Sequence, residues 1–199
     1  MNEAAVLDPW RLIGEDLLRY KQYGASNTFA VVFVAPGFRA LVRYRIFLGW
    51  HRRCRTKIGK RIVWAMYAFV RKGMEGKTGI SLPLHAQLGR APYFPHNGSF
   101  QIARGTEVGD YCVFHQGVTL GTAGHMPHHL PPKIGSRVFV GANASIIGPI
   151  QVGDDAVVGS NAVVISDVAD RAVMAGNPAR QVSDKGSSQF MLIASPKKR

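Results

Sequence analysis

The histidines are the residues of this sequence best suited to chemistry near neutral pH. The chain has seven of them, and three lie in distinctive contexts. His96 follows Pro95, His115 precedes Gln116, and His125 opens a short run that contains two more histidines. An imidazole titrates close to physiological pH, so it can take up a proton and return it within one reaction. These contexts favour general acid–base catalysis.

Metal binding and disulfide formation are less favoured. Cys54 and Cys112 lie far apart, and no Cys-x-x-Cys spacing is present. His128 and His129 are adjacent residues of a predicted loop, and we do not expect a site made of histidines alone to hold a metal ion. Two isolated cysteines suit a reducing cytoplasm.

The positive charge is concentrated in one part of the chain. Residues 1–80 contain 15 lysines and arginines against 5 acidic residues, whereas residues 81–182 contain 6 of each. No nucleic-acid-binding motif accompanies this charge, so we expect no nucleic acid partner. Peripheral association with an anionic membrane, or contact with an acidic protein, suits such a segment.

The apolar runs predict no membrane-spanning segment. The longest ones, residues 29–36 and 62–70, are too short to cross a bilayer. Acidic residues interrupt the N-terminal region where a signal peptide would have its apolar core. We expect a cytoplasmic protein, with the inner face of the membrane as its only membrane contact.

Helices are predicted for the first 80 residues. Asp8-Pro9 is typical of a helix start, and apolar residues then recur at helical spacing as far as Leu18. The segment 24–27 interrupts this pattern. A second helix is predicted after Pro36-Gly37, with its arginines on the solvated face, and a third over about residues 58–70.

A six-residue period replaces the helical pattern after residue 80. Glycine often follows the periodic aliphatic residue, and a small or aliphatic residue stands four places after it. Neither an α-helix nor an alternating strand has this period, whereas a triangular coil with one short strand on each side does. The pattern therefore predicts a parallel β-helix. The residues in step are Leu82, Leu88, Phe94, Val108, Phe114, Leu120, Ile134, Val140, Ile146, Val152, Val158 and Val164.

The period is broken at two places. Two extra residues precede Ile102, close to His96, and eight extra residues precede Ile134. The second interruption predicts a loop over about residues 122–132, which carries His125. Loops that leave a rigid scaffold are common locations for binding residues.

In these features the sequence resembles the hexapeptide-repeat acyltransferases, especially the serine acetyltransferase-like and polysaccharide O-acetyltransferase group. The resemblance implies an α+β fold, with an N-terminal helical domain (1–79), a left-handed parallel β-helix (80–182) and a basic C-terminal tail (183–199). It also implies a homotrimer, or a dimer of trimers, with active sites between subunits. The matching motifs are Pro95-His96, Gln116-Gly117-Val118-Thr119-Leu120-Gly121, Pro132-Lys133-Ile134-Gly135 and Gly176-Asn177-Pro178-Ala179-Arg180.

The resemblance implies transfer of an acetyl group from acetyl-CoA to a hydroxyl. His96 stands at the position of the family's catalytic histidine. His125 lies in a loop similar to the histidine-containing loop of galactoside and maltose acetyltransferases, so it is the rival base. His115 is expected to point outward and, with Gln116, to contact the acceptor. The residues expected to bind acetyl-CoA are Gly121, Thr122, Lys133, Ala142, Ser160 and Arg180.

Four positions depart from the serine acetyltransferase pattern. Pro95 replaces an aspartate, Ser81 replaces the acid that orients the imidazole, and Leu130-Pro131 replaces an Arg-His pair. The missing groups handle the charged ends of an amino acid, so the sequence favours a hydroxyl of a sugar or cell-surface polysaccharide precursor. Serine O-acetylation in cysteine biosynthesis is the alternative, and a non-catalytic β-helix scaffold is a third.

Overall fold

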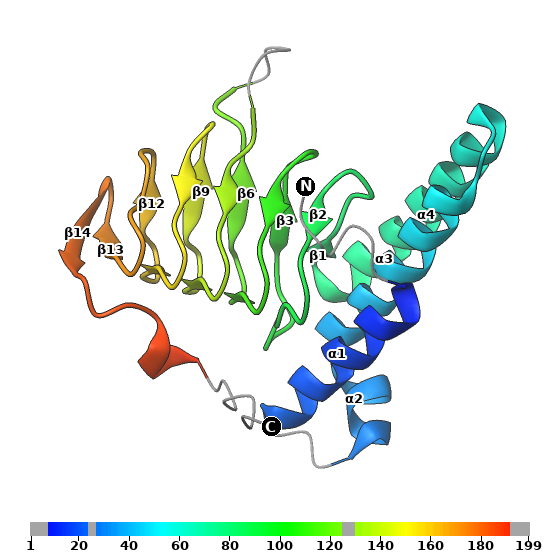
Figure 1. Ribbon diagram of the computed structural model, residues 1–199, viewed down its shortest axis with the longest axis horizontal. Coiled ribbons are helices and arrows are strands. Elements are labelled where there is room, and N and C mark those ends of the chain that lie inside the picture. Colours follow the sequence, from blue (N-terminus) through cyan, green and yellow to red (C-terminus); the bar gives the residue numbers. More distant parts are fainter. Residues whose placement is uncertain (1–7, 24–26, 125–129, 192–199) are drawn as a thin grey trace.

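The computed structural model describes residues 8–23, 27–124 and 130–191. Four α-helices lie in this part of the chain: α1 (Pro9–Gln22), α2 (Thr28–Val34), α3 (Pro36–Arg53) and α4 (Lys57–Thr78). From Ile80 onward the chain winds into a coil of short strands, and the helices pack at its first turns (Figure 1). The predicted sequence of helices followed by a left-handed β-helix is confirmed.

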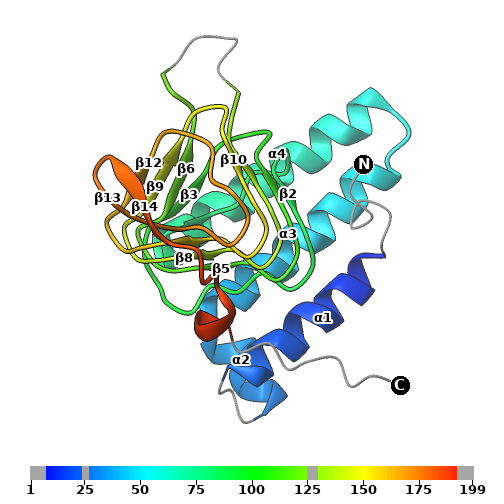
Figure 2. The ribbon, with the colours of Figure 1, turned by 60° about the vertical axis from the view of Figure 1, so that its left-hand side comes forward.

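Three sheets form the walls of the coil, whose successive turns overlap in Figure 2. All the strand pairs are parallel except the last, in which β14 (Ala179–Ser183) runs antiparallel to β13 (Val173–Gly176). The chain visits the three sheets in turn. Sheet A contains β1 (Ile80–Ser81), β3 (Phe100–Ile102), β6 (Thr119–Gly121), β9 (Ser145–Ile147) and β12 (Val163–Val164). Sheet B contains β2 (Gln87–Leu88), β4 (Glu107–Val108), β7 (Lys133–Ile134) and β10 (Gln151–Val152). Sheet C contains β5 (Val113–Phe114), β8 (Phe139–Val140), β11 (Val157–Val158), β13 (Val173–Gly176) and β14 (Ala179–Ser183).

Inward-pointing aliphatic side chains of successive turns form the core of the coil. Val140 of β8 is aligned with Val158 of β11, three hexapeptides further along the chain. The predicted six-residue period is therefore the repeat of the structure, and burial of each such side chain stabilises the coil by roughly 1.5–3 kcal/mol. The periodic side chains with relative exposure of 4% or less include Val108, Ile134, Val140, Ile146, Val152, Val158 and Val164.

The sequence patterns miss α2 and underestimate α4. Asn27 caps α2, since its side chain accepts a hydrogen bond from the Ala30 N–H at 2.7 Å. Helix α4 continues through Gly73 and Gly76 and ends at Thr78, and the following C-cap residue Gly79 has a left-handed φ of 73°. No helix in the described part of the chain is long and apolar enough to cross a membrane.

A buried ion pair joins the helices to the first turns of the coil. Arg45 of α3 lies 3.2 Å from Asp16 of α1, and the two side chains are 1% and 0% exposed. The guanidinium also donates to the carbonyls of Leu88 and Gly89, while the carboxylate accepts from the Ala91 N–H at 3.1 Å. The prediction that the arginines of this helix face solvent is therefore wrong for Arg45, whose charge is satisfied inside the protein.

Replacing Arg45 by alanine leaves the Asp16 carboxylate buried without its partner. We expect the free energy of unfolding to fall by about 3–5 kcal/mol, measured by urea denaturation followed by circular dichroism. The control is Arg43→Ala, an exposed position of the same helix, which should cost less than about 0.5 kcal/mol. Equal stability of the two variants would contradict the proposed importance of the ion pair.

Candidate active site

His96 lies at the corner where the chain passes from sheet C to sheet A, in the loop that contains the two extra residues. Its side chain is exposed. Helix α1 holds the loop through Tyr20, whose hydroxyl accepts from the Phe94 N–H at 3.1 Å and donates to the Phe94 carbonyl at 3.4 Å. A Cβ on Gly37 would lie 2.7 Å from the Phe94 Cβ, so α3 approaches this loop only because residue 37 is glycine.

His115 lies beside His96, and we call these two residues the histidine pair. The centroids of their rings are 5.6 Å apart, and the His115 ring also lies 5.1 Å from that of Phe139. His115 is half-buried, because the neighbouring rings of His96 and Phe139 cover part of its side chain. Burial, together with the neighbouring His96, lowers the pKa of His115. His115 therefore stays neutral at a pH where an ordinary imidazole is partly protonated.

The segment that follows β14 supports the ring beside the histidine pair. Phe190 stacks on Phe139 with ring centroids 5.0 Å apart. Ser187 anchors the segment, because its N–H donates to the Asp155 carbonyl at 2.8 Å and its hydroxyl donates to the Arg137 carbonyl at 2.6 Å. The described part of the predicted tail thus packs along sheet C.

Gln116 carries an unpaired oxygen next to the histidine pair. Its Oε1 is buried and accepts no hydrogen bond from the described residues. Gly98, in the loop of His96, packs directly against the side chain of Gln116, because a Cβ on Gly98 would lie 2.7 Å from the Gln116 Cβ. A buried acceptor without a donor costs free energy, so this oxygen is suited to a ligand that brings a donor.

Residues for which the sequence predicts a role in cofactor binding lie on opposite edges of sheet A. Ala142 and Ser160 follow β8 and β11, and they share the corner of Gln116 through 2.9 Å backbone hydrogen bonds between successive turns. Gly121 ends β6, and Thr122 follows it at the other edge, where the chain leaves for sheet B.

The remaining predicted residues are further dispersed. Lys133 lies on sheet B with its ammonium 3.5 Å from the carboxylate of Glu107, and both side chains are largely exposed. Arg180 lies on β14, where it is exposed and donates to the Ala179 carbonyl. His125 lies outside the described residues. A single chain therefore does not bring all the predicted residues into one site.

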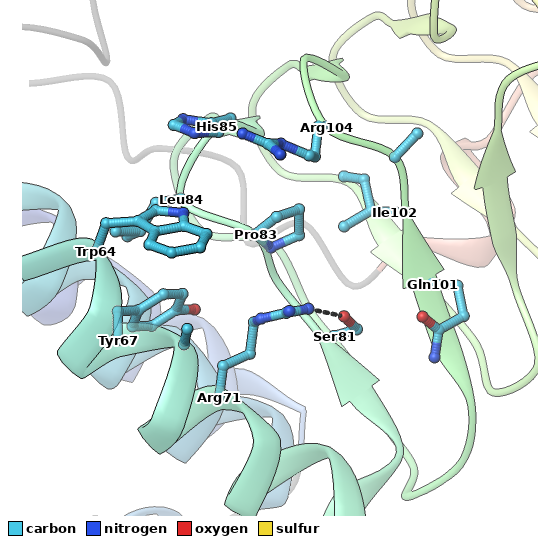
Figure 3. A pocket seen from close by; sticks show the side chains of 12 residues that line it. Trp64, Tyr67, Arg71, Ser81, Pro83, Leu84, His85, Gln101, Ile102 and Arg104 are labelled. Carbon is cyan, nitrogen blue, oxygen red and sulfur yellow. Dashed lines mark hydrogen bonds between the residues drawn. The ribbon is translucent and has the colours of Figure 1, made fainter. Parts of the chain in front are cut away.

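A cavity of about 320 Å³ lies between α4 and the first turns of the coil (Figure 3). Arg71 of α4 donates to the Ser81 hydroxyl at 2.8 Å and to Glu75 at 2.7 Å. His85 and Arg104 lie along the opposite wall, and burial together with Arg104 lowers the pKa of His85. No acidic side chain is among the described residues that line the cavity, so its lining is positively charged. The histidine pair does not line it.

Part of the repeat matches a known protein family, and most of the chain is similar to known proteins. The bacterial transferase hexapeptide (six repeats) family matches residues 131–166. The serine acetyltransferase of Helicobacter pylori is 35% identical over 159 residues, which are 80% of this chain and 88% of the relative. The chain belongs to the serine acetyltransferase family. It is therefore an acyltransferase, and the scaffold interpretation is not supported.

Solved serine acetyltransferases share the fold of this chain. The Vibrio cholerae O1 biovar El Tor enzyme superposes with a TM-score of 0.78 at 28% identity, over 89% of this chain and 68% of that one. The Neisseria gonorrhoeae enzyme in complex with serine gives a TM-score of 0.75 at 26% identity, over 90% and 72%. The shares of the solved chains that this chain spans are close to two thirds, and another Neisseria gonorrhoeae structure is covered over 65%.

The structure shows the surroundings of the positions at which the sequence departs from the expected serine acetyltransferase pattern. Ser81 offers a hydroxyl that accepts from Arg71, where the family pattern has a carboxylate. Pro95 is half-buried and uncharged, as is Pro131, while Leu130 is exposed. None of these four side chains carries a charge.

Three residues near these sites are missed by the predictions from the sequence. Arg71 belongs to a run of basic helical residues, so nothing distinguishes it from a solvated arginine. Phe139 carries one signal: an aromatic residue occupies the outward position next to an inward valine of the repeat. Phe190 carries none, because it lies beyond the repeat and reaches Phe139 only through the fold of the tail.

The imidazole of His96 should influence the titration of His115. In the wild type we expect the pKa of His115 below its usual value of about 6.5, and in His96→Asn we expect it to rise, because one of its two causes is removed. The measurement is an NMR titration of the imidazole C–H resonances.

His85 provides the internal control, since its lowered pKa arises from other groups and should not move. Because folding lowers the pKa of His115, its protonation favours the unfolded chain, and its contribution to stability is lost as the pH falls through the usual histidine range. A His115 pKa that is unchanged by His96→Asn would contradict the coupling.

Proposed function

We propose that this acyltransferase moves the acetyl group of acetyl-CoA to the hydroxyl of L-serine, with His96 as the general base. The observation that carries the proposal is the histidine pair, whose exposed member His96 lies at a corner of a chain that is 35% identical to a serine acetyltransferase. This acceptor is the alternative of the sequence analysis, and the relatives favour it over the sugar acceptor.

The proposed chemistry needs one base and one set of hydrogen-bond donors. An alcohol is a weak nucleophile at neutral pH, so the neutral imidazole of His96 takes the hydroxyl proton as the serine oxygen bonds to the thioester carbon. Backbone N–H groups of the coil stabilise the resulting oxyanion. The intermediate then expels the thiolate of CoA, and the imidazolium returns its proton to the sulfur. The products are O-acetylserine and CoA.

His115 and Gln116 are proposed to contact the acceptor. The lowered pKa of His115 keeps its ring uncharged, so it does not repel the cationic form of His96 during the reaction. The unpaired Oε1 of Gln116 can accept a hydrogen bond from the hydroxyl or ammonium group of serine.

Two neighbouring chains are proposed to complete each acetyl-CoA site. The proposed ligands of the pantetheine arm lie on opposite edges of sheet A, so one edge of each of two chains can enclose the arm. A homotrimer provides this arrangement three times, and pairs of trimers give a hexamer. In such an assembly His125 of the adjoining subunit is the alternative base. The proposed ligands are Gly121, Thr122, Ala142 and Ser160 for the arm, and Lys133 and Arg180 for the phosphates.

A hydroxyl of a sugar or polysaccharide precursor is the second candidate acceptor. The specific observation in its favour is the uncharged character of Ser81, Pro95 and Leu130-Pro131, which removes the groups that would bind the charged ends of serine. A neutral acceptor does not need those groups.

A cytoplasmic location is proposed from the cysteines. Cys54 and Cys112 are both free, which suits a reducing compartment. Peripheral membrane association is proposed separately from the catalytic function, because it depends on the surface of the helices and not on the active site.

Thiol release from acetyl-CoA tests the choice of acceptor and of base. With purified protein we expect release that depends on L-serine, and His96→Ala should lower the rate by about 10²–10⁴-fold. His51→Ala is the matched control, since it removes a histidine of α3 that is remote from the pair, and its rate should equal that of the wild type.

The panel of acceptors also contains neutral sugars and oligosaccharides. Release with these alone would exclude serine and support the second candidate. Serine-dependent release that survives His96→Ala would assign the base to His125.

Gln116→Leu tests the contact with the acceptor. Because the buried Oε1 has no partner in the described part of the free chain, its removal should not lower the free energy of unfolding. Loss of its hydrogen bond to the acceptor should raise KM by about tenfold, as measured by thiol release. An unchanged KM would place the acceptor elsewhere.

A further inference from the structure

The outer face of α4 is apolar and uncovered. Ile58, Ile62, Met66 and Phe69 are 70%, 55%, 50% and 84% exposed. In an α-helix these positions fall within an arc of about 80°, so the four side chains form one continuous row. We call these four residues the apolar stripe.

Helix α4 already buries its opposite face in the protein. Tyr67 is 2% exposed and Met74 is 6% exposed, and the Tyr67 hydroxyl donates to the Leu82 carbonyl of the coil. A helix that is apolar on two opposite faces is normally covered on both. Figure 1 shows α4 at the end of the molecule farthest from β14, and within the described part of the chain the outer face remains open.

Basic residues border the apolar stripe on both sides. By helical position Arg61 and Lys72 lie along one side and Lys77 along the other, and all three are exposed. The one acidic residue of α4, Glu75, is bound by Arg71 at 2.7 Å. No free negative charge of this helix therefore offsets the basic border.

The same character extends over the helical part of the chain. Of the 16 exposed large hydrophobic side chains among the described residues, 12 precede residue 80. The excess of basic over acidic residues is also found there. The wall of the β-helix is nearly free of both features, so this side of the molecule has a distinct surface chemistry.

We propose that the apolar stripe docks α4 onto a membrane surface that contains anionic phospholipid. Apolar side chains enter the headgroup boundary, and the bordering lysines and arginines meet the lipid phosphates. A second copy of this chain is a poorer occupant, because face-to-face contact would bring Arg61 and Lys72 of both chains together. The proposal depends on the helical surface alone and is independent of the acceptor.

Flotation of the full chain with lipid vesicles tests the proposal. We expect binding to phosphatidylcholine vesicles that contain phosphatidylglycerol, no binding to phosphatidylcholine alone, and weaker binding as NaCl is raised. Ile62→Asp combined with Phe69→Asp should abolish binding. The matched control is Ile165→Asp on the coil, where the side chain is 59% exposed, and it should bind as the wild type does.

A second variant tests the charges alone. Arg61→Gln combined with Lys72→Gln should weaken binding by about 25-fold, roughly fivefold for each residue. Thermal melts that match the wild type show that the variants are folded. Serine-dependent thiol release in solution, measured on the same variants, should be unchanged, so failure of membrane binding and failure of the proposed reaction are separate results.

Two outcomes overturn the proposal. The first is absence of binding to anionic vesicles, or equal binding by the wild type and the Ile62→Asp, Phe69→Asp variant. The second is a change in oligomeric state of that variant, seen by size exclusion with light scattering, while the wild type does not bind vesicles. That result would assign the apolar stripe to contacts between chains.

Discussion

Stacking of identical turns is the constraint on which the rest of this structure depends. The N–H of Ser145 donates to the carbonyl of Ala162 in the next turn at 2.9 Å, and comparable bonds recur along the wall. At that spacing the corner positions accept only small side chains, and Ala144 and Ala162 are both fully buried. The wall is therefore rigid, and side chains that face outward at its corners, including those of the histidine pair, are held at fixed positions along it.

The helical part of the chain contributes to the site as well as to the fold. Asp16 and Tyr20 lie one turn apart on α1, and each bonds to the backbone of the segment that leads to His96. Arg45 fixes Asp16 in turn. The position of the candidate base thus depends on residues far away in the sequence, because the loop at the slip in the repeat has few strand hydrogen bonds of its own.

The coil could be predicted from the sequence because its information is local and repeated. Every third hexapeptide returns to the same wall, so the sequence alone predicts that residues such as Val140 and Val158 pair with one another. The helices carry no such repeat. The ion pair of Arg45 with Asp16 joins two helices, and nothing in the sequence distinguishes Arg45 from its solvated neighbours. Helix α2 is missed because it is only seven residues long, and a short run that is mostly apolar also fits a strand.

The candidate site was only partly predictable for the same physical reason. His96 is identifiable from the slip in the repeat and Gln116 from a motif, and the structure packs Gly98 of the His96 loop against Gln116. The residues predicted to bind the pantetheine arm of acetyl-CoA lie on two opposite edges of sheet A, which are separated within one chain. Ser81 looks like a lost acid in the sequence, whereas in the structure its hydroxyl is held by Arg71, which the sequence does not connect to it.

The reversal of direction at β14 limits how copies of this molecule can meet. A coil of parallel strands ends in open backbone edges, which in other proteins recruit further strands and grow into fibres. Here β14 folds back on β13 and occupies the edge of sheet C, while the helices cover the first turn. A strand added at this edge would therefore have to pair with β14, which runs against the direction of the coil, so the parallel pairing of sheet C is not continued beyond it.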